Sequence, residues 1–163
     1  MKMTHMKTPI HRYTFNSKKL RTWVEENVEG RVLNLFAGKT RLSETSCINE
    51  VRNDIDTTMD ADFHFDAVWF CRTWSGDKFN TIILDPPYSY RKSMEKYNGK
   101  VSSPFNQLKD EVVRILEPGG IVMTFGYHSV SMGNKRGFEV EQILLVSHGG
   151  AIHDTIGTIE RKK

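Results

Sequence analysis

An acid, two prolines and an aromatic ring stand together at Asp85-Pro86-Pro87-Tyr88, directly after the apolar run 80–84. The prolines fix two φ angles and remove two backbone donors, so the run must end here with its next carbonyls turned outward. A planar amine suits such a turn, because the Asp85 carboxylate and the Pro86 carbonyl accept its two N–H bonds while Tyr88 stacks on its ring. The alternative is a strand-terminating turn that carries a surface tyrosine.

A second turn that could bind a ligand is Phe36-Ala37-Gly38-Lys39-Thr40, at the end of the apolar run 32–36. We expect it to open a helix whose first N–H groups receive an anionic group. It is not a phosphate-binding P-loop, because that motif requires a glycine at position 33, where the chain has leucine.

Two acids follow the weaker apolar runs. Asp54, with Ile55 beside it, comes at the end of run 51–54 and could accept both hydroxyls of a ribose. Asp66-Ala67 follows run 61–65 at a predicted helix start. For each acid the alternative is a solvated turn.

The elements that must position these residues alternate between strands and helices. Strands are predicted at 32–36, 51–54, 61–65, 80–84, 120–125, 138–147 and 152–159, and helices at 17–27, 66–74 and 104–116. This order predicts an α/β fold with a doubly wound, mostly parallel seven-stranded sheet. The last two strands, joined through His148-Gly149-Gly150, predict an antiparallel hairpin at one sheet edge. Ligands bind such sheets at the carboxyl ends of the strands.

Length and composition narrow the classes of protein. The chain has 163 residues, of which 38% are apolar, and no run approaches the ~20 apolar residues of a membrane helix. We therefore expect a single domain spanning 1–163, with no membrane span, and two reduced thiols that point to the cytoplasm. The net charge is +3, yet residues 1–24 hold six cations and no acid. This basic arm is either a solubilising tail or a mobile segment that contacts phosphates.

With turn, acid, acid and Asp-Pro-Pro-Tyr after successive strands, the chain resembles the amino-methyltransferases that use S-adenosylmethionine. The resemblance is greatest to the N6-adenine DNA methyltransferases, including small archaeal and phage members, and runs over nearly the whole chain. It implies a Rossmann-like methyltransferase fold, S-adenosylmethionine as cofactor, and adenine in DNA, single-stranded or flipped out, as substrate.

The resemblance also implies roles for individual residues. Asp85, Pro86 and Tyr88 would be catalytic. The residues expected to bind the cofactor are Tyr13, Thr14, Phe15, Phe36, Ala37, Gly38, Asp54, Ile55, Asp66, Ala67 and Asp85. Those expected to bind the substrate are Tyr88, Arg91, Lys92, Tyr127 and His128. The chain departs from the family at Lys39 and Thr40, which replace small residues, and at Asn34, near the place of an acid.

We expect no dedicated region for recognising a nucleic-acid target sequence, because no separate target-recognition domain fits in the chain. Sequence choice must come from the basic arm, from loop 89–103, from a partner protein, or be absent. The loop interleaves cations with aromatic rings, which suits phosphates and unstacked bases, although a solvated lid has a similar composition. The histidines and cysteines show no metal spacing, and we expect no metal.

Three other functions stay open at this point. The same turn suits an amine of adenine or guanine in RNA. Methylation of a protein glutamine is a further alternative, although relatives with that role have asparagine at the place of Asp85. The fold could also hold nucleosides or nucleic acid without turnover.

Overall fold

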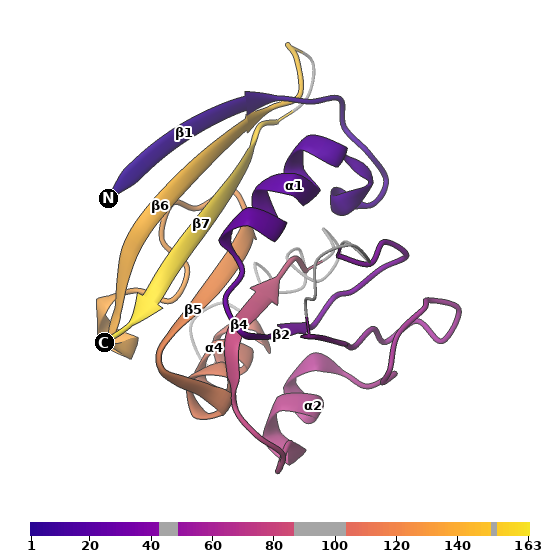
Figure 1. Cartoon of the computed structure of the whole chain (residues 1–163), viewed down its shortest axis with the longest axis vertical. Coiled ribbons are helices and arrows are strands. Elements are labelled where there is room, and N and C mark those ends of the chain that lie inside the picture. Colours follow the sequence, from indigo (N-terminus) through magenta and orange to yellow (C-terminus); the bar gives the residue numbers. More distant parts are fainter. Residues whose placement is uncertain (43–48, 87–103, 151–152) are drawn as a thin grey trace.

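The computed structural model describes residues 1–42, 49–86, 104–150 and 153–163 (Figure 1). The strands are β1 (Lys2–Lys7), β2 (Arg31–Asn34), β3 (Asn49–Arg52), β4 (Phe79–Leu84), β5 (Leu116–Gly126), β6 (Phe138–Ser147) and β7 (Thr155–Lys162). The helices are α1 (Lys18–Asn27), α2 (Ala67–Thr73) and α4 (Pro104–Ile115), with short 3-10 turns at Thr14–Asn16 and Asn134–Arg136.

One seven-stranded sheet runs through the molecule in the order β1-β6-β7-β5-β4-β2-β3. All of its strands are parallel except β7, which pairs antiparallel with both β5 and β6. The predicted α/β class, mostly parallel sheet and C-terminal hairpin are therefore confirmed. The hairpin does not form the sheet edge as expected, because β1 pairs with the outer side of β6.

Helices cover both faces of this sheet (Figure 1). On one face α1 packs Leu20 and Val24 into a core with Ile83, Met123 and Phe125. On the other face α2 and α4 bury a second core, which includes Phe70, Leu108, Val112, Ile82 and Val122. Neighbouring positions of β4 and β5 thus point into opposite cores, as the two-residue period of a strand requires.

Capping residues define where two helices begin. The Ser17 side chain accepts a hydrogen bond from Leu20 N, and the Asp66 side chain accepts one from Trp69 N. Such caps satisfy backbone donors that the first helical turn leaves unpaired. The starts predicted at 17 and 66 lie at these two caps.

Several predicted segments differ in the structure. The strand expected at 61–65 is reduced to one bridge between Asn53 and Phe63, and β1 supplies the seventh strand instead. The strand expected at 32–36 ends at Asn34, and the one expected at 51–54 covers 49–52. The last strand lies at 155–162 rather than 152–159.

The basic arm is not a mobile tail along its length. Its first residues form β1, and its last ones form the start of α1. Lys19 donates a hydrogen bond from Nζ to the Lys7 carbonyl, joining the two.

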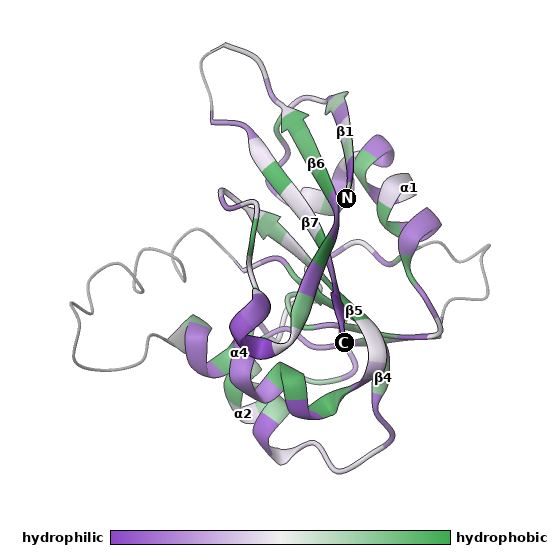
Figure 2. Cartoon of the chain, turned by 90° about the vertical axis from the view of Figure 1, so that its left-hand side faces the viewer, coloured by the Kyte–Doolittle hydropathy of each residue, from purple (hydrophilic) through white to green (hydrophobic). Residues whose placement is uncertain are grey.

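In β6, the partner of β1, the segment 143–146 is continuously apolar (Figure 2), with Leu144 and Val146 buried. No helix in the described parts of the chain is long and apolar enough to cross a bilayer.

Candidate active site

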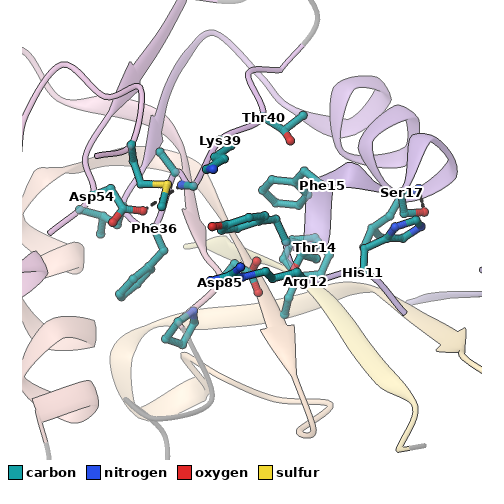
Figure 3. A pocket seen from close by; sticks show the side chains of 18 of the residues that line it. His11, Arg12, Thr14, Phe15, Ser17, Phe36, Lys39, Thr40, Asp54 and Asp85 are labelled. Atoms are coloured by element: carbon teal, nitrogen blue, oxygen red, sulfur yellow. Dashed lines mark hydrogen bonds between the residues drawn. The ribbon is translucent and has the colours of Figure 1, made fainter. Parts of the chain in front are cut away.

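A cavity of about 600 Å³ opens at the sheet edge where the parallel strands end (Figure 3). Its wall is formed by the segments that follow β1, β2, β3, β4, β5 and β6, together with the first residue of β7. It therefore brings together nearly all of the described residues for which a ligand role was predicted. These are Tyr13, Thr14, Phe15, Phe36, Ala37, Gly38, Asp54, Ile55, Asp66, Ala67, Asp85, Pro86 and Tyr127.

The turn after β2 is held by the end of β3. Gly38 N donates to Asp54 Oδ2 over 2.9 Å, and Ala37 N donates to the Asn53 carbonyl over 3.0 Å. Gly38 has a φ of +56°, a conformation that favours glycine. The expected helix does not begin in residues 39–42. The Gly38 N–H is thus occupied by a carboxylate of the protein rather than presented to a ligand.

Asp54 keeps acceptor capacity towards the cavity. Its Oδ1 accepts from Asp56 N over 3.0 Å, so each carboxylate oxygen carries one hydrogen bond from the backbone. An ionised carboxylate offers about four acceptor positions. The remaining lone pairs can accept a vicinal pair of hydroxyl groups, as predicted for a ribose.

A buried arginine fixes the same turn from behind, and sequence analysis missed it. The Arg52 side chain is fully buried, and its guanidinium donates to the carbonyls of Ala37, Gly38 and Thr40 over 3.0 to 3.2 Å. It also donates to the Asp60 carbonyl and to Glu50 Oε1. The available signal was an arginine in the middle of a predicted buried strand, where an unpaired charge is costly.

Glu50 completes this internal cluster. Besides Arg52, it accepts hydrogen bonds from Asn34 Nδ2 and from Leu42 N. Burial raises the pKa of Glu50, and the neighbouring Arg52 charge partly opposes that rise. Asn34, at the position where the resembled family often has an acid, thus bonds to an acid contributed by β3.

The N-terminal segment forms one wall of the cavity. Phe15 is buried edge-on against Phe125, with ring centroids 5.5 Å apart. Its two ends are joined because Thr8 Oγ1 and Ser17 Oγ share a hydrogen bond of 2.8 Å, and Thr8 N donates to the Ser147 carbonyl of β6 over 3.1 Å. His148 Nδ1 donates to the Thr8 carbonyl over 3.0 Å, since a carbonyl can only accept.

The opposite end of the cavity also carries apolar side chains. Ile55 is 69% exposed beside it, and Phe65 lines it while contacting Trp69 with centroids 4.6 Å apart. Asp66 Oδ1 caps α2, which leaves Oδ2 for another donor. Flat apolar surface next to a carboxylate can hold an aromatic base with an amino group.

Asp85 and Pro86 lie between these two ends, directly after the buried Leu84 of β4. Pro86 is buried and Asp85 is partly buried. In Figure 3 the Asp85 and Arg12 side chains project into the same cavity. Tyr127 lines the cavity after β5, whereas the neighbouring His128 is exposed and does not line it.

Some predicted residues lie outside the described part of the chain. These are Tyr88, Arg91 and Lys92, together with the rest of loop 89–103. Within the described residues, no group of three or more histidine, cysteine, aspartate or glutamate side chains could hold a metal ion.

Comparison with solved structures places this sheet among methyltransferases. TrmN from Thermus thermophilus superposes with a TM-score of 0.62 at 17% identity, covering 89% of this chain and 48% of TrmN. The N-methyltransferase NodS from Bradyrhizobium japonicum, in complex with S-adenosyl-L-homocysteine, gives 0.60 at 11% identity, covering 91% and 85%. A Pyrococcus abyssi tRNA (uracil-54, C5)-methyltransferase, also in complex with S-adenosyl-L-homocysteine, gives 0.59 at 16% identity, covering 94% and 40%.

The chain thus spans about half the length of TrmN. No protein-family model matches the sequence, and no curated protein matches it either. At these identities the similarity is one of fold. The chain has the Rossmann-like fold of the methyltransferases with which it superposes.

Proposed function

We propose that this protein is an S-adenosylmethionine-dependent methyltransferase acting on an exocyclic amine of a nucleic-acid base, with N6 of adenine in DNA as the preferred target. The observation that carries the proposal is the single cavity at the strand ends. It joins Asp54 and Asp66, which suit a nucleoside, to the Asp85-Pro86 turn, which suits a planar amine. The fold shared with methyltransferases in complex with S-adenosyl-L-homocysteine supports the same choice of cofactor.

The residues of the cavity fit this cofactor in size and chemistry. A volume of about 600 Å³ lies within the usual 300–1,000 Å³ of small-molecule sites. Asp54 would accept the ribose hydroxyls, and Asp66 the amino group of the adenine beside Ile55 and Phe65. The N-terminal wall of Tyr13, Thr14 and Phe15 would enclose the amino-acid end.

Bound S-adenosylmethionine supplies an electrophilic methyl group on a sulfonium. The Asp85 carboxylate and Pro86 carbonyl accept the two N–H bonds of the target amine, which turns the nitrogen lone pair out of ring conjugation. Transfer of the methyl group to that lone pair would leave the cofactor as its uncharged thioether, and Asp85 and Pro86 would hold the methylated amine until its extra proton passes to solvent. Catalysis by alignment and fixed dipoles requires no covalent enzyme intermediate.

RNA is the second candidate substrate. One structure with this fold is a tRNA methyltransferase. The amine-binding turn itself does not distinguish deoxyribose from ribose in the target strand. DNA and RNA would use the same site, so an assay that supplies each of them separately distinguishes the two candidates.

The decisive experiment supplies S-adenosylmethionine with matched single-stranded and duplex DNA and RNA, then identifies methylated nucleosides by mass spectrometry. We expect N6-methyladenosine in its deoxy form from DNA. Asp85→Ala is the matched variant, because it removes the carboxylate that would accept an N–H bond of the target amine. It should abolish most turnover while cofactor affinity stays within about tenfold. Cofactor binding without any methylated product would instead support a non-catalytic binding module.

A further inference from the structure

A second, polar groove of about 550 Å³ lies on the other side of the turn after β2. It shares Lys39 and Thr40 with the cavity and is otherwise lined by α1, Arg41 and Asp60. Thr40 Oγ1 donates to Asn16 Oδ1 over 2.6 Å, which joins the turn to the start of α1. The groove is therefore continuous with the rim of the candidate active site.

Cations predominate in this groove. Lys18 and Arg21 come from α1, and Lys39 and Arg41 come from the turn, against the two carboxylates of Glu25 and Asp60. Neither lysine forms an ion pair with any residue that the structure describes. Two elements far apart in sequence thus place positive charge around one polar hollow.

The two acids orient the arginines without covering them. Asp60 accepts from Nε and Nη2 of Arg41 over 2.7 and 2.8 Å, and Nη1 makes no hydrogen bond within the described residues. Arg21 donates from Nη1 to the Phe15 carbonyl over 3.4 Å, and its Nε lies 3.7 Å from Glu25 Oε1. The Arg41 guanidinium, held along its Nε–Nη2 edge, presents Nη1 in a fixed direction, which suits a phosphate oxygen.

We propose that this groove binds backbone phosphates of the nucleic-acid substrate, next to the nucleotide whose base enters the cavity. The proposal rests on the proposed function, because it assumes a polynucleotide substrate. The chemistry favours a phosphodiester, because Lys18, Arg21 and Arg41 line a hollow whose other side chains are all polar or charged. Lys39, at the rim, has its Nζ 5.8 Å from the centre of the Tyr13 ring of the neighbouring cavity. The groove would fix the strand without reading its sequence, since phosphate contacts position and base contacts specify.

The test measures binding of a fluorescent single-stranded oligonucleotide by anisotropy over a range of salt concentrations. The groove variant is Lys18→Gln with Arg41→Gln. The matched control is Lys2→Gln with Lys7→Gln, which removes the same charge from β1, also within the N-terminal half. Neither pair lines the cavity.

We expect the groove variant to bind at least about tenfold more weakly at low salt, and its log–log salt slope to fall by roughly 0.7 per lost phosphate contact. The control should change the slope little. Equal weakening in both variants would show diffuse attraction, and no weakening in either would leave the groove without a ligand; both results overturn the proposal. Binding of inorganic phosphate without binding of the oligonucleotide would overturn it as well.

Calorimetry with S-adenosyl-L-homocysteine, run on the same proteins, separates this proposal from the proposed function. Both variants should keep the wild-type affinity, which also confirms that they fold. If the wild type fails to bind this compound but shows the groove effect, the methyltransferase proposal fails and the phosphate groove stands. If it binds the compound but shows no groove effect, the groove alone fails.

Discussion

Asp54 and Asp66 each use part of their carboxylate for a structural hydrogen bond and face the cavity with the rest. Asp54 holds Gly38 N, and Asp66 caps α2. An alanine at either position would remove both tasks together. Asparagine keeps one acceptor oxygen and removes the charge, which is enough for the single cap of Asp66 but serves only one of the two backbone donors of Asp54.

The first prediction therefore concerns Asp54. Asp54→Asn should weaken S-adenosyl-L-homocysteine binding about ten- to a hundredfold, because a hydrogen bond to a charged acceptor contributes roughly 1.5–3 kcal/mol. Urea unfolding should show a loss of stability for Asp54→Asn, which leaves one of the two backbone donors of Gly38 and Asp56 unpaired, and a larger loss for Asp54→Ala, which leaves both unpaired. Calorimetry and urea titration measure the two effects. Unchanged affinity in both variants would remove Asp54 from the ribose site.

The second prediction concerns Cys71, a residue of α2 that is fully buried in the core. Burial, helped by the nearby Glu111, raises the pKa of the Cys71 thiol to about 12. At pH 8 only about one thiol in ten thousand is then ionised, against about a quarter in an unfolded chain. In a Cys47→Ser background, iodoacetamide should label no thiol in the native protein and one in urea. Labelling of the folded protein at the rate of free cysteine would contradict this.

At the scale of elements, the sequence predicted the central strands and their polar ends well. Buried runs such as 80–84 have no periodicity but end at strong turn signals, so β4 and the position of Asp85 were clear. β1 was missed because four of its six residues are polar, with a lysine at each end, so that it resembles a solvated arm. Its strand character comes from pairing with β6, a contact that local sequence does not encode.

Two of the predicted segments that the structure does not contain, the helix after residue 38 and the strand at 61–65, share a physical reason, which is the hydrogen bonding of Arg52 at the end of β3. No helix begins in 39–42, where carbonyls that a helix would pair internally are bound by Arg52. The strand expected at 61–65 stops at a bridge, where Asp62 N and Phe63 N both donate to the Arg52 carbonyl. Local propensity was overridden by one long-range hydrogen-bonded cluster, and no single-residue pattern signals it.

The third prediction tests that cluster. Arg52→Met should lower the free energy of unfolding by about 3–5 kcal/mol, because it leaves Glu50 buried without its counter-charge. Adding Glu50→Gln should recover part of the loss, so the double variant should be less destabilised than the sum of the singles. Urea unfolding of the four proteins gives this coupling. Strict additivity would show that the two side chains act independently.

At the scale of the whole molecule, the cavity wall draws on the ends of six strands as well as the N-terminal segment. No single hairpin or helix contains the site. A ligand that fills it must therefore bind the native sheet far better than any partly folded form, and its binding energy adds to global stability.

The fourth prediction follows from this arrangement. With a dissociation constant near 1 μM, S-adenosyl-L-homocysteine at 1 mM should raise the free energy of unfolding by about 4 kcal/mol. Thermal unfolding monitored by circular dichroism should then shift as one cooperative transition. Adenine alone, as a matched ligand that lacks the ribose and amino-acid end, should shift it much less. A shift of equal size with both ligands would contradict the prediction, because the adenine base alone would then supply the binding energy.

The pairing of β1 with β6 determines when the site can form during synthesis. Lys2 lies opposite Gln142, and the segment 8–17, which forms one wall of the cavity, follows β1 directly. During synthesis that wall therefore leaves the ribosome early but has nothing to pair with until β6 emerges. Contacts so distant along the chain carry a large loop-closure cost and form late. The nascent protein would complete this pocket only after β6 (Phe138–Ser147) has left the ribosome.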